Sequence, residues 1–387
     1  MPEEYLKRQF KDEAVSLYSI ENRTKDSALH RYVVSTSDTR NMLNFPEIVN
    51  SDFTDLMKNG VTNTLKVLNN IEHLSRISSK QVNVYHILRG GLNFQVRNAL
   101  QKAFGYKWHS SSYITSQRFE ENGEFSISDD SYRKFQIPEN PTIYSADIVA
   151  SGASPDNSLH YLDNYLTRKK INLKNFFFVT IGGIKAEEVL EKWDRIFKEN
   201  YSQYERTILI YLEGRFALGS KNLPLNNVLP NTDLLKNYKF GSLLSPEYEI
   251  SQFEKMIISI EGCVIYDGGK KSFEPVKHII DILDFWEKQE KSAVDQNLSL
   301  WDEYNARFPL DMYLDMELSI PADTYRGLKE RKEEYWHGVS DLEYKRLFDK
   351  FRWLWSDSRI TRAKEKGSLI STCQKKINYL KSLLEAI

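Results

Sequence analysis

Four short apolar segments alternate with amphipathic stretches between residues 82 and 212, and this alternation limits the possible folds more than any other feature. The apolar segments are residues 82–88, 143–149, 176–181 and 207–212, and the stretches with a helical period are residues 92–104, 159–170 and 185–200. Strands that are apolar along their whole length are typical of a parallel sheet covered by helices on both faces. The sequence therefore predicts an α/β fold with a parallel sheet flanked by helices.

The two ends of the chain have a different pattern. Residues 1–80 are predicted to be mainly helical, and five of the seven tryptophans lie in the last third, among apolar positions spaced three to four residues apart. Residues 247–260 are a further helix candidate, and segment 223–231, with two prolines and three asparagines, is the best linker candidate. We therefore expect a first domain at residues 1–225, with a helical N-terminal segment, and a mostly helical region at residues 226–387.

The charge and cysteine content exclude several classes of protein. Lys and Arg number 53 against 54 Asp and Glu, so the net charge of −1 gives no reason to expect non-specific binding to nucleic acid or to an anionic membrane. No apolar run approaches the roughly 20 residues that span a bilayer, and the first residues lack the apolar segment of a secretory signal. Cys263 and Cys373 lie far apart without metal-ligand spacing. These features predict a cytoplasmic protein without a membrane segment.

The first of two informative strand-to-helix turns contains Arg89, Gly90 and Gly91, directly after segment 82–88. Adjacent glycines let backbone N–H groups approach a ligand closely, and the start of the following helix favours anions. Arg89 adds a guanidinium group suited to phosphate oxygens. An ordinary tight turn explains the same residues, so this turn alone leaves both interpretations open.

The second turn follows the segment 143–149, where Asp147 stands near the end of a predicted strand. It contains Ser151, Gly152, Ala153 and Ser154, with Ser154 predicted as a helix N-cap and Pro155 as the first helical residue. N–H groups and hydroxyls at a helix start are suited to phosphate, and Asp147 can accept hydrogen bonds from a sugar diol or hold Mg²⁺ through water. A capped turn with a surface aspartate is the alternative interpretation.

Together the two turns resemble the motifs of the type I phosphoribosyltransferases, most closely the uracil phosphoribosyltransferase branch. HILRGGLNFQVRNAL is similar to the pyrophosphate loop of that branch and the helix after it, and ADIVASGAS is similar to the family's loop for phosphoribosyl pyrophosphate (PRPP). The resemblance extends over about residues 30–215. It implies a phosphoribosyltransferase-like sheet, followed here by a helical region that the housekeeping enzymes lack.

The resemblance also implies roles for individual residues. Ser151, Gly152, Ala153 and Ser154 would bind the 5′-phosphate of PRPP, Asp147 would bind the ribose hydroxyls, and Arg89, Gly90 and Gly91 would contact pyrophosphate. Mg²⁺ bound with PRPP is the implied cofactor. Residues 116–138 would form a loop that closes over the reacting sugar, with Arg118 as a pyrophosphate ligand, although a solvated loop arginine is the alternative.

The segment that would bind the base is matched less well. The first candidate is Tyr266, Asp267 and Gly268, within the glycine-rich stretch 262–270, and the second is residues 214–216. An ordinary hairpin or turn explains either segment as well. Among the histidines, His86 is expected to be a satisfied core residue, and His109, near the loop, is a candidate ligand contact.

Two departures from the family's pattern bear on activity. Ala146 stands where the family has a second acidic residue, and the loop reads SGAS in place of TGGT, with Asp156 just after it. An alanine in place of the second glycine is tolerated only where φ is negative, and Asp156 places negative charge near the expected phosphate. These changes are compatible with an altered substrate, weak catalysis or a domain that only binds.

Three hypotheses follow. The first is a Mg²⁺- and PRPP-dependent transferase acting on a nucleobase, with a pyrimidine favoured. The second is a toxin or antiphage effector that acts on nucleotides under the control of a partner, by analogy with the phosphoribosyltransferase-like effectors of bacterial systems such as retrons. The third is a non-catalytic sensor or structural subunit that binds PRPP or a nucleotide. The aromatic C-terminal region is the expected contact for a protein partner or a second copy of the chain.

Overall fold

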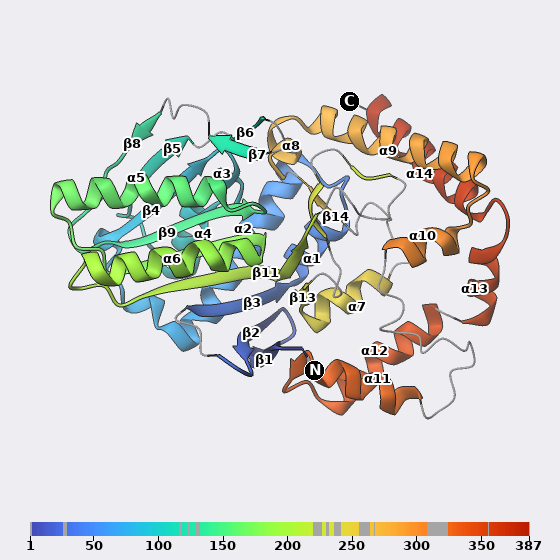
Figure 1. The fold of residues 1–387 in the computed structure, drawn as a ribbon, viewed down its shortest axis with the longest axis horizontal. Coiled ribbons are helices and arrows are strands. Elements are labelled where there is room, and N and C mark those ends of the chain that lie inside the picture. Colours follow the sequence, from blue (N-terminus) through green and yellow to red (C-terminus); the bar gives the residue numbers. More distant parts are fainter. Residues whose placement is uncertain are drawn as a thin grey trace.

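Figure 1 shows the computed structural model, which describes residues 2–25, 29–115, 118–121, 124–127, 132–219, 227–229, 232–235, 241–254, 264–266, 268–307, 324–354 and 356–386. Its central sheet contains, in spatial order, β15 (Trp336–His337), β1 (Glu4–Lys11), β2 (Val15–Asn22), β3 (His30–Thr36), β11 (Arg206–Leu218), β10 (Asn175–Gly183), β9 (Thr142–Val149), β4 (Val82–Leu88), β5 (Ser110–Thr115) and β8 (Arg133–Lys134). The consecutive strands from β3 to β5 in this order run parallel. Their carboxyl ends therefore meet at one edge.

Helices cover both faces of this parallel part. On one face α5 (Ala153–Lys169) and α6 (Ile184–Asn200) share an apolar core with Tyr85 and Phe176, and on the other α2 (Asn50–Glu72) and α4 (Val96–Phe104) share one with Val84 and Phe177. Neighbouring residues of one strand thus enter opposite cores, because side chains alternate across a sheet. The predicted α/β class and its four buried strands are confirmed.

The expectation that residues 1–80 are mainly helical is wrong for the first 36 residues. β1, β2 and β3 form an antiparallel meander there, and β3 then joins the parallel sheet beside β11. β-branched and aromatic residues such as Val33, Val34 and Tyr32 are buried between the two layers of helices, which favours a strand. The chain becomes helical afterwards, in α1 (Ser37–Asn44) and α2.

The region after residue 225 is mainly helical, as predicted. Its helices are α7 (Pro246–Glu254), α8 (Gly268–Phe273), α9 (Pro275–Asp295), α10 (Leu300–Arg307), α11 (Thr324–Glu333), α12 (Asp341–Leu354), α13 (Asp357–Lys364) and α14 (Ser368–Glu385). A separate apolar core, which includes Trp286 and Leu380, joins α9, α10, α13 and α14. α7 covers the first part of the predicted helix 247–260, and residues 255–260 lie outside the described residues.

Short strands connect this helical region to the sheet. β13 (Leu243–Leu244) and β12 (Thr232–Leu235) pair with β11, β14 (Val264–Tyr266) pairs with β12, and β15 pairs with β1. The two parts therefore share hydrogen bonds across the expected boundary at residue 225, and that boundary stays a prediction. Of the linker candidate, residues 227–229 are described.

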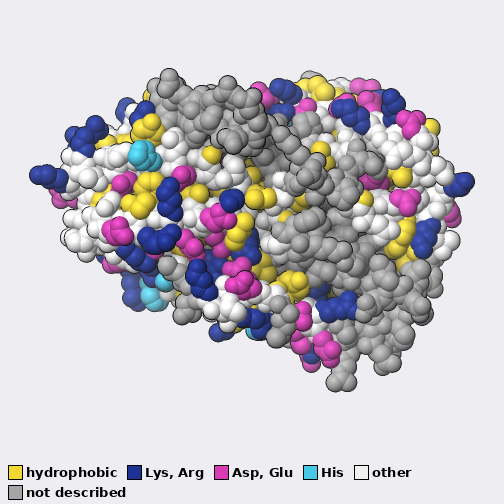
Figure 2. Space-filling view, in the orientation of Figure 1, with side chains coloured by type: hydrophobic (Ala, Val, Ile, Leu, Met, Phe, Trp, Pro, Cys, Tyr) yellow, Lys and Arg dark blue, Asp and Glu magenta, His cyan; other side chains and the backbone are white. Residues whose placement is uncertain are grey.

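The described surface carries charges of both signs. On the face that Figure 2 shows, basic and acidic side chains are interspersed over α5 and α6, in keeping with the net charge of −1. None of the described helices combines the length and the apolar character needed to span a bilayer.

Candidate functional site

The two turns that the sequence singles out meet at the carboxyl edge of the sheet. β4 and β9 are adjacent and parallel, so the residues that follow them lie side by side. A Cβ atom on Gly90 would overlap with Oδ1 of Asp147, and one on Gly91 would lie 2.5 Å from the backbone oxygen of Ala146. The glycines thus allow the first turn to rest directly on the end of β9. This close approach is the central feature of the site.

The first turn leads into a short helix before the longer one. Arg89 follows β4 through a cis peptide bond with Leu88, and α3 (Gly90–Asn93) begins at the next residue. Gln95, with a φ of 52°, separates α3 from α4, so the single predicted helix 92–104 is divided. The exposed Arg89 guanidinium lies 5.7 Å from the ring centroid of Phe273 in α8. An exposed guanidinium beside a glycine backbone is suited to anionic oxygens.

The carboxylate of Asp147 is held at the base of this edge. Its side chain is 8% exposed, and Oδ1 accepts a hydrogen bond of 2.9 Å from the backbone N–H of Ile148. The backbone oxygen of Asp147 accepts a further bond of 2.8 Å from Thr180 Oγ1 on β10. These bonds hold the carboxylate next to Gly90 at the carboxyl edge of the sheet.

The loop after β9 places the start of a long helix at the same edge. The prediction of Ser154 as N-cap is wrong: Gly152 occupies the cap position with a φ of 81°, and α5 begins at Ala153. A Cβ on Gly152 would lie 2.9 Å from Val189 Cγ2, so conformation and space both favour glycine. Ala153, as a residue of the helix, has a negative φ, and the alanine of SGAS therefore carries no backbone strain.

The first turn of α5 is suited to an anion. Four N–H groups at a helix start lack partners in the helix, and the helix dipole favours negative charge there. Ser151 is exposed beside this end, with its Oγ 3.5 Å from the Ala153 nitrogen, and Ser154 lies within the first turn. This arrangement fits a phosphate group at residues 151–154.

Asp156 does not leave an uncompensated charge at this loop. Its Oδ1 accepts hydrogen bonds of 2.7 Å from both Lys192 Nζ and Trp193 Nε1 on α6. The carboxylate is therefore directed to the neighbouring helix and paired with a lysine. The expectation that Asp156 places negative charge near the phosphate stays a prediction.

The remaining predicted residues are only partly described. Arg118 begins β6 (Arg118–Glu121), which forms a hairpin with β7 (Glu124–Ile127) inside the predicted loop 116–138, but its side chain lies outside the description. Tyr266 ends β14 and Gly268 begins α8, whereas Asp267 lies outside the described residues. α8 packs against α3, so the chain that follows the first base candidate lies beside the Gly90 turn.

The second base candidate, residues 214–216, is not an accessible turn. These residues lie within β11, where Arg215 is buried and forms ion pairs with Glu4 (2.5 Å) and Glu187 (2.9 Å). Phe216 is also buried, within an apolar core. The segment therefore stabilises the sheet and is not available to a base.

His86 is buried, as expected, but not fully satisfied. It stacks on Tyr113 at 4.9 Å, and its Nε2 has no hydrogen-bond partner among the described residues. Burial, together with the nearby Arg97 and His109, lowers the pKa of His86 to about 4. His109 lies with this cluster on the α4 side of the sheet.

One titratable residue at the carboxyl edge was missed by sequence reasoning. Glu213 of β11 is fully buried, and its carboxylate accepts hydrogen bonds from Ser35 Oγ (2.6 Å) and the Thr36 backbone N–H (2.9 Å) at the end of β3. Burial raises its pKa to about 7. The available signal was a single glutamate inside the long apolar run of β11.

Comparison with known proteins gives matches to solved structures. No protein-family model matches the chain, and no curated protein matches it in sequence. The AQ2163 protein of Aquifex aeolicus is similar over 49% of this chain and 90% of its own, with 14% identity and a TM-score of 0.34. For a hypoxanthine phosphoribosyltransferase from Staphylococcus aureus, 32% of this chain and 64% of that enzyme are covered, with 18% identity and a TM-score of 0.22. A hypoxanthine-guanine phosphoribosyl transferase from L. donovani is similar over 44% of this chain and 84% of its own, with 14% identity and a TM-score of 0.25.

Proposed function

We propose that this protein binds PRPP at the carboxyl edge of its sheet and transfers phosphoribose between pyrophosphate and a nucleobase. The observation that carries the proposal is the packing of Gly90 against the Asp147 carboxylate. This packing brings the turn at residues 89–91, the end of β9 with Asp147, and the start of α5 to one place. PRPP carries a pyrophosphate, a ribose diol and a 5′-phosphate, so its three polar parts match these three elements.

Each element has a role that follows from its chemistry. The N–H groups at the start of α5, with Ser151 and Ser154, would hold the 5′-phosphate. Asp147 would accept hydrogen bonds from the ribose hydroxyls and thereby orient the reacting carbon. Backbone N–H groups at Gly90 and Gly91 and the guanidinium of Arg89 would bind the pyrophosphate.

Catalysis would depend mainly on charge. The bond from ribose to pyrophosphate lengthens as negative charge gathers on the leaving group, and Arg89 with the backbone N–H groups would stabilise that charge. Because Asp147 is buried and hydrogen-bonded, its carboxylate would stay beside the ribose as positive charge develops there. A base nitrogen then forms the new bond, so no nucleophilic side chain is needed.

The residues present fit a Mg²⁺ ion that arrives with its substrate. Mg²⁺ in phosphate sites is usually held by one or two carboxylates together with substrate oxygens and water. Asp147 supplies one carboxylate, and no group of three or more potential metal ligands occurs among the described residues, so a cage made by the protein alone is not expected. When bound, the ion would neutralise charge on the pyrophosphate.

The base would enter between the Gly90 turn and α8. The packing of α8 against α3 supports this position, because it brings the chain after Tyr266 and Gly268 to the pyrophosphate side of the site. The resemblance of the two motifs favours a pyrimidine. Hypoxanthine and guanine belong in the same test, since two of the structures compared above act on purines.

One observation favours the alternative of a domain that binds without catalysis. Ala146, where the resembling family has an acidic residue, is 2% exposed and belongs to the apolar core beneath α2 and α4. The site therefore has one strand carboxylate in place of two. A PRPP sensor would keep the phosphate and ribose contacts and lack turnover.

The deciding experiment measures pyrophosphate release from PRPP and Mg²⁺ in the presence of uracil, cytosine, hypoxanthine or guanine. We expect release that depends on one base and is lost in Asp147→Ala, while Asp156→Ala keeps it. Binding of PRPP without release for every base would favour the sensor. Equal PRPP affinity in the wild type and Asp147→Ala, without turnover, would contradict both.

A further inference from the structure

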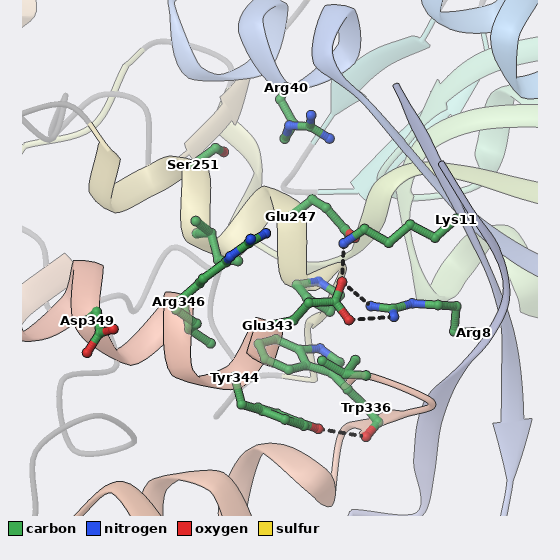
Figure 3. Close-up of a pocket in the computed structure, with 14 residues that line it drawn as sticks. Arg8, Lys11, Arg40, Glu247, Ser251, Trp336, Glu343, Tyr344, Arg346 and Asp349 are labelled. Carbon is green, nitrogen blue, oxygen red and sulfur yellow. Dashed lines mark hydrogen bonds and ion pairs between the residues drawn. The ribbon is translucent and has the colours of Figure 1, made fainter. Parts of the chain in front are cut away.

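A cavity of about 450 Å³ lies apart from the two turns (Figure 3). Its walls come from β1, α1, α7 and α12, so it is bounded by both the sheet and the C-terminal helical region. None of its lining residues belongs to the turns at residues 89–91 and 147–154. Its volume is within the range of small-molecule sites.

The two glutamates that line the cavity on α7 and α12 already have partners. Glu343 accepts hydrogen bonds from both terminal nitrogens of Arg8, at 2.7 and 3.1 Å, and also pairs with Lys11. Glu247 accepts bonds from the Tyr18 hydroxyl (2.9 Å) and from Lys11 (3.1 Å). The charges of Arg8 and Lys11 are thus compensated within the wall.

Two further arginines, Arg346 and Arg40, line the cavity without an ion pair in the described part of the chain, and the charge of Arg40 also acts on the carboxyl groups of Glu213 and Asp38. Arg346 of α12 extends toward α7, and the Arg40 guanidinium lines the cavity from α1, as Figure 3 shows. Among the described residues neither forms an ion pair, and Arg40 donates a hydrogen bond of 2.7 Å to Ser35 Oγ. The carboxylate of Asp349 points away from both (Figure 3). The cavity therefore has two guanidinium groups available to an anion.

The rest of the wall is suited to an apolar body. Trp336 is buried, with its Nε1 donating to the Leu244 backbone oxygen at 2.9 Å, and its ring stacks on Tyr344. Leu347 and Ile250 continue this surface. An indole fixed in this way gives a rigid apolar wall between the charged groups.

We propose that this cavity binds a small organic phosphate monoester, with the phosphate between Arg40 and Arg346 and the organic part against Trp336 and Leu347. A phosphate monoester carries close to two negative charges at pH 7, which matches the two arginines that form no ion pair among the described residues. Guanidinium groups bind phosphate oxygens in a bidentate manner, which a lysine-lined cavity cannot provide. The ligand would bridge α1 and α12, and none of its contacts belongs to the candidate PRPP site.

Titration calorimetry with phenyl phosphate tests this proposal, with benzyl alcohol as the uncharged counterpart. We expect saturable one-to-one binding of phenyl phosphate only, weakened at least about tenfold in Arg346→Gln, because one charged hydrogen-bonding group is lost. Lys345→Gln is the matched control: it removes one positive charge from the adjacent, exposed position of α12, outside the cavity. Arg40→Gln should weaken binding similarly, but Arg40 also contacts Ser35, so Arg346 is the cleaner position.

Asp147→Asn separates the two sites. Phenyl phosphate binding that is retained in Asp147→Asn and lost in Arg346→Gln supports the proposal, whether or not the protein has transferase activity. Absence of saturable binding, equal binding by wild type and Arg346→Gln, or loss of binding in Asp147→Asn alone would overturn it.

Discussion

Gly90 lies so close to Asp147 that a Cβ atom at position 90 would overlap with the Asp147 carboxylate. The two residues belong to different turns, after β4 and after β9, and 57 positions separate them in the chain. Their contact makes the two turns one structural unit. A substitution in either turn should therefore change the conformation of the other turn.

Gly90→Ala tests this unit. The methyl group must displace the Asp147 side chain or the turn itself, and overpacking of this kind usually costs about 1–3 kcal/mol of stability. We expect PRPP affinity, measured by calorimetry, to fall at least about tenfold, because the carboxylate and the pyrophosphate turn both move.

Gly105→Ala is the control for that variant. Gly105 has a φ of 69° with no atom within 4 Å of an added Cβ, and it lies at the end of α4. The substitution should cost about 1 kcal/mol through backbone strain alone and leave PRPP affinity unchanged. Equal PRPP affinity in both variants would show that the Gly90 contact has no part in binding.

Asp156→Asn should have little effect on ligand binding. The Asp156 carboxylate is paired with Lys192, and both side chains are partly exposed, so loss of the pair should cost no more than about 1 kcal/mol in urea unfolding. PRPP affinity should stay within about twofold of wild type, whereas Asp147→Asn should reduce it at least about tenfold. Tighter PRPP binding by Asp156→Asn would mean that the Asp156 charge does oppose the phosphate.

The parts of the fold that the sequence predicts correctly are segments whose residues are mostly apolar because they are buried along their whole length. β10 is buried along its length, and residues 176–181 are apolar except for Thr180, so this segment can be identified as a strand. β1 has one buried residue, Leu6, among half-buried and exposed positions, contains several charged residues, and pairs with β15 from the far end of the chain. No local pattern reveals such a pairing, and β1 was therefore missed. β2 and β3 are largely buried and were missed as well, so burial alone did not identify them.

The candidate PRPP site and the cavity also differ in how much of each can be predicted from the sequence. Arg89, Gly90 and Asp147 occur in short motifs whose residue types indicate phosphate and ribose chemistry. The cavity that Arg40 and Arg346 line has no motif, because these two residues stand 306 positions apart and line one cavity only in the folded protein. The helix start at Gly152 was misplaced for a related reason: contact with Val189 of α6 favours glycine there.

Glu213 should make stability depend on pH. Its pKa of about 7 in the folded protein exceeds the ordinary value of 4.5, so between these values the folded chain holds a proton that the unfolded chain has lost. The contribution of Glu213 to the free energy of unfolding is therefore largest at low pH. It falls by up to a few kcal/mol as the pH rises from about 4.5 to 7. Urea unfolding at pH 5, 6, 7 and 8 measures it.

Glu213→Gln and Glu205→Gln complete that experiment. The stability advantage of wild type over Glu213→Gln should shrink as the pH rises, whereas the difference from Glu205→Gln, at an exposed position, should stay constant. The comparison of variants is needed because the buried His86, with its lowered pKa, has the opposite effect at acidic pH. An advantage of wild type over Glu213→Gln that does not change with pH would show that the carboxylate is ionised throughout.

Glu343→Gln should loosen the contact between α12 and β1. Glu343 is 18% exposed and pairs with Arg8 and Lys11 of β1, and these pairs lower its pKa despite burial. Removing its charge leaves Arg8 without its ion pair and Lys11 with Glu247 alone, so we expect a loss of about 1–2 kcal/mol in urea unfolding at low salt and a smaller loss at 1 M salt. Glu333→Gln, which affects a pair within the C-terminal region, should cost much less. A phosphate monoester in the cavity should reduce the loss in Glu343→Gln, because it supplies the negative charge that the variant lacks; an unchanged loss in its presence would separate the ion-pair cluster from the ligand site.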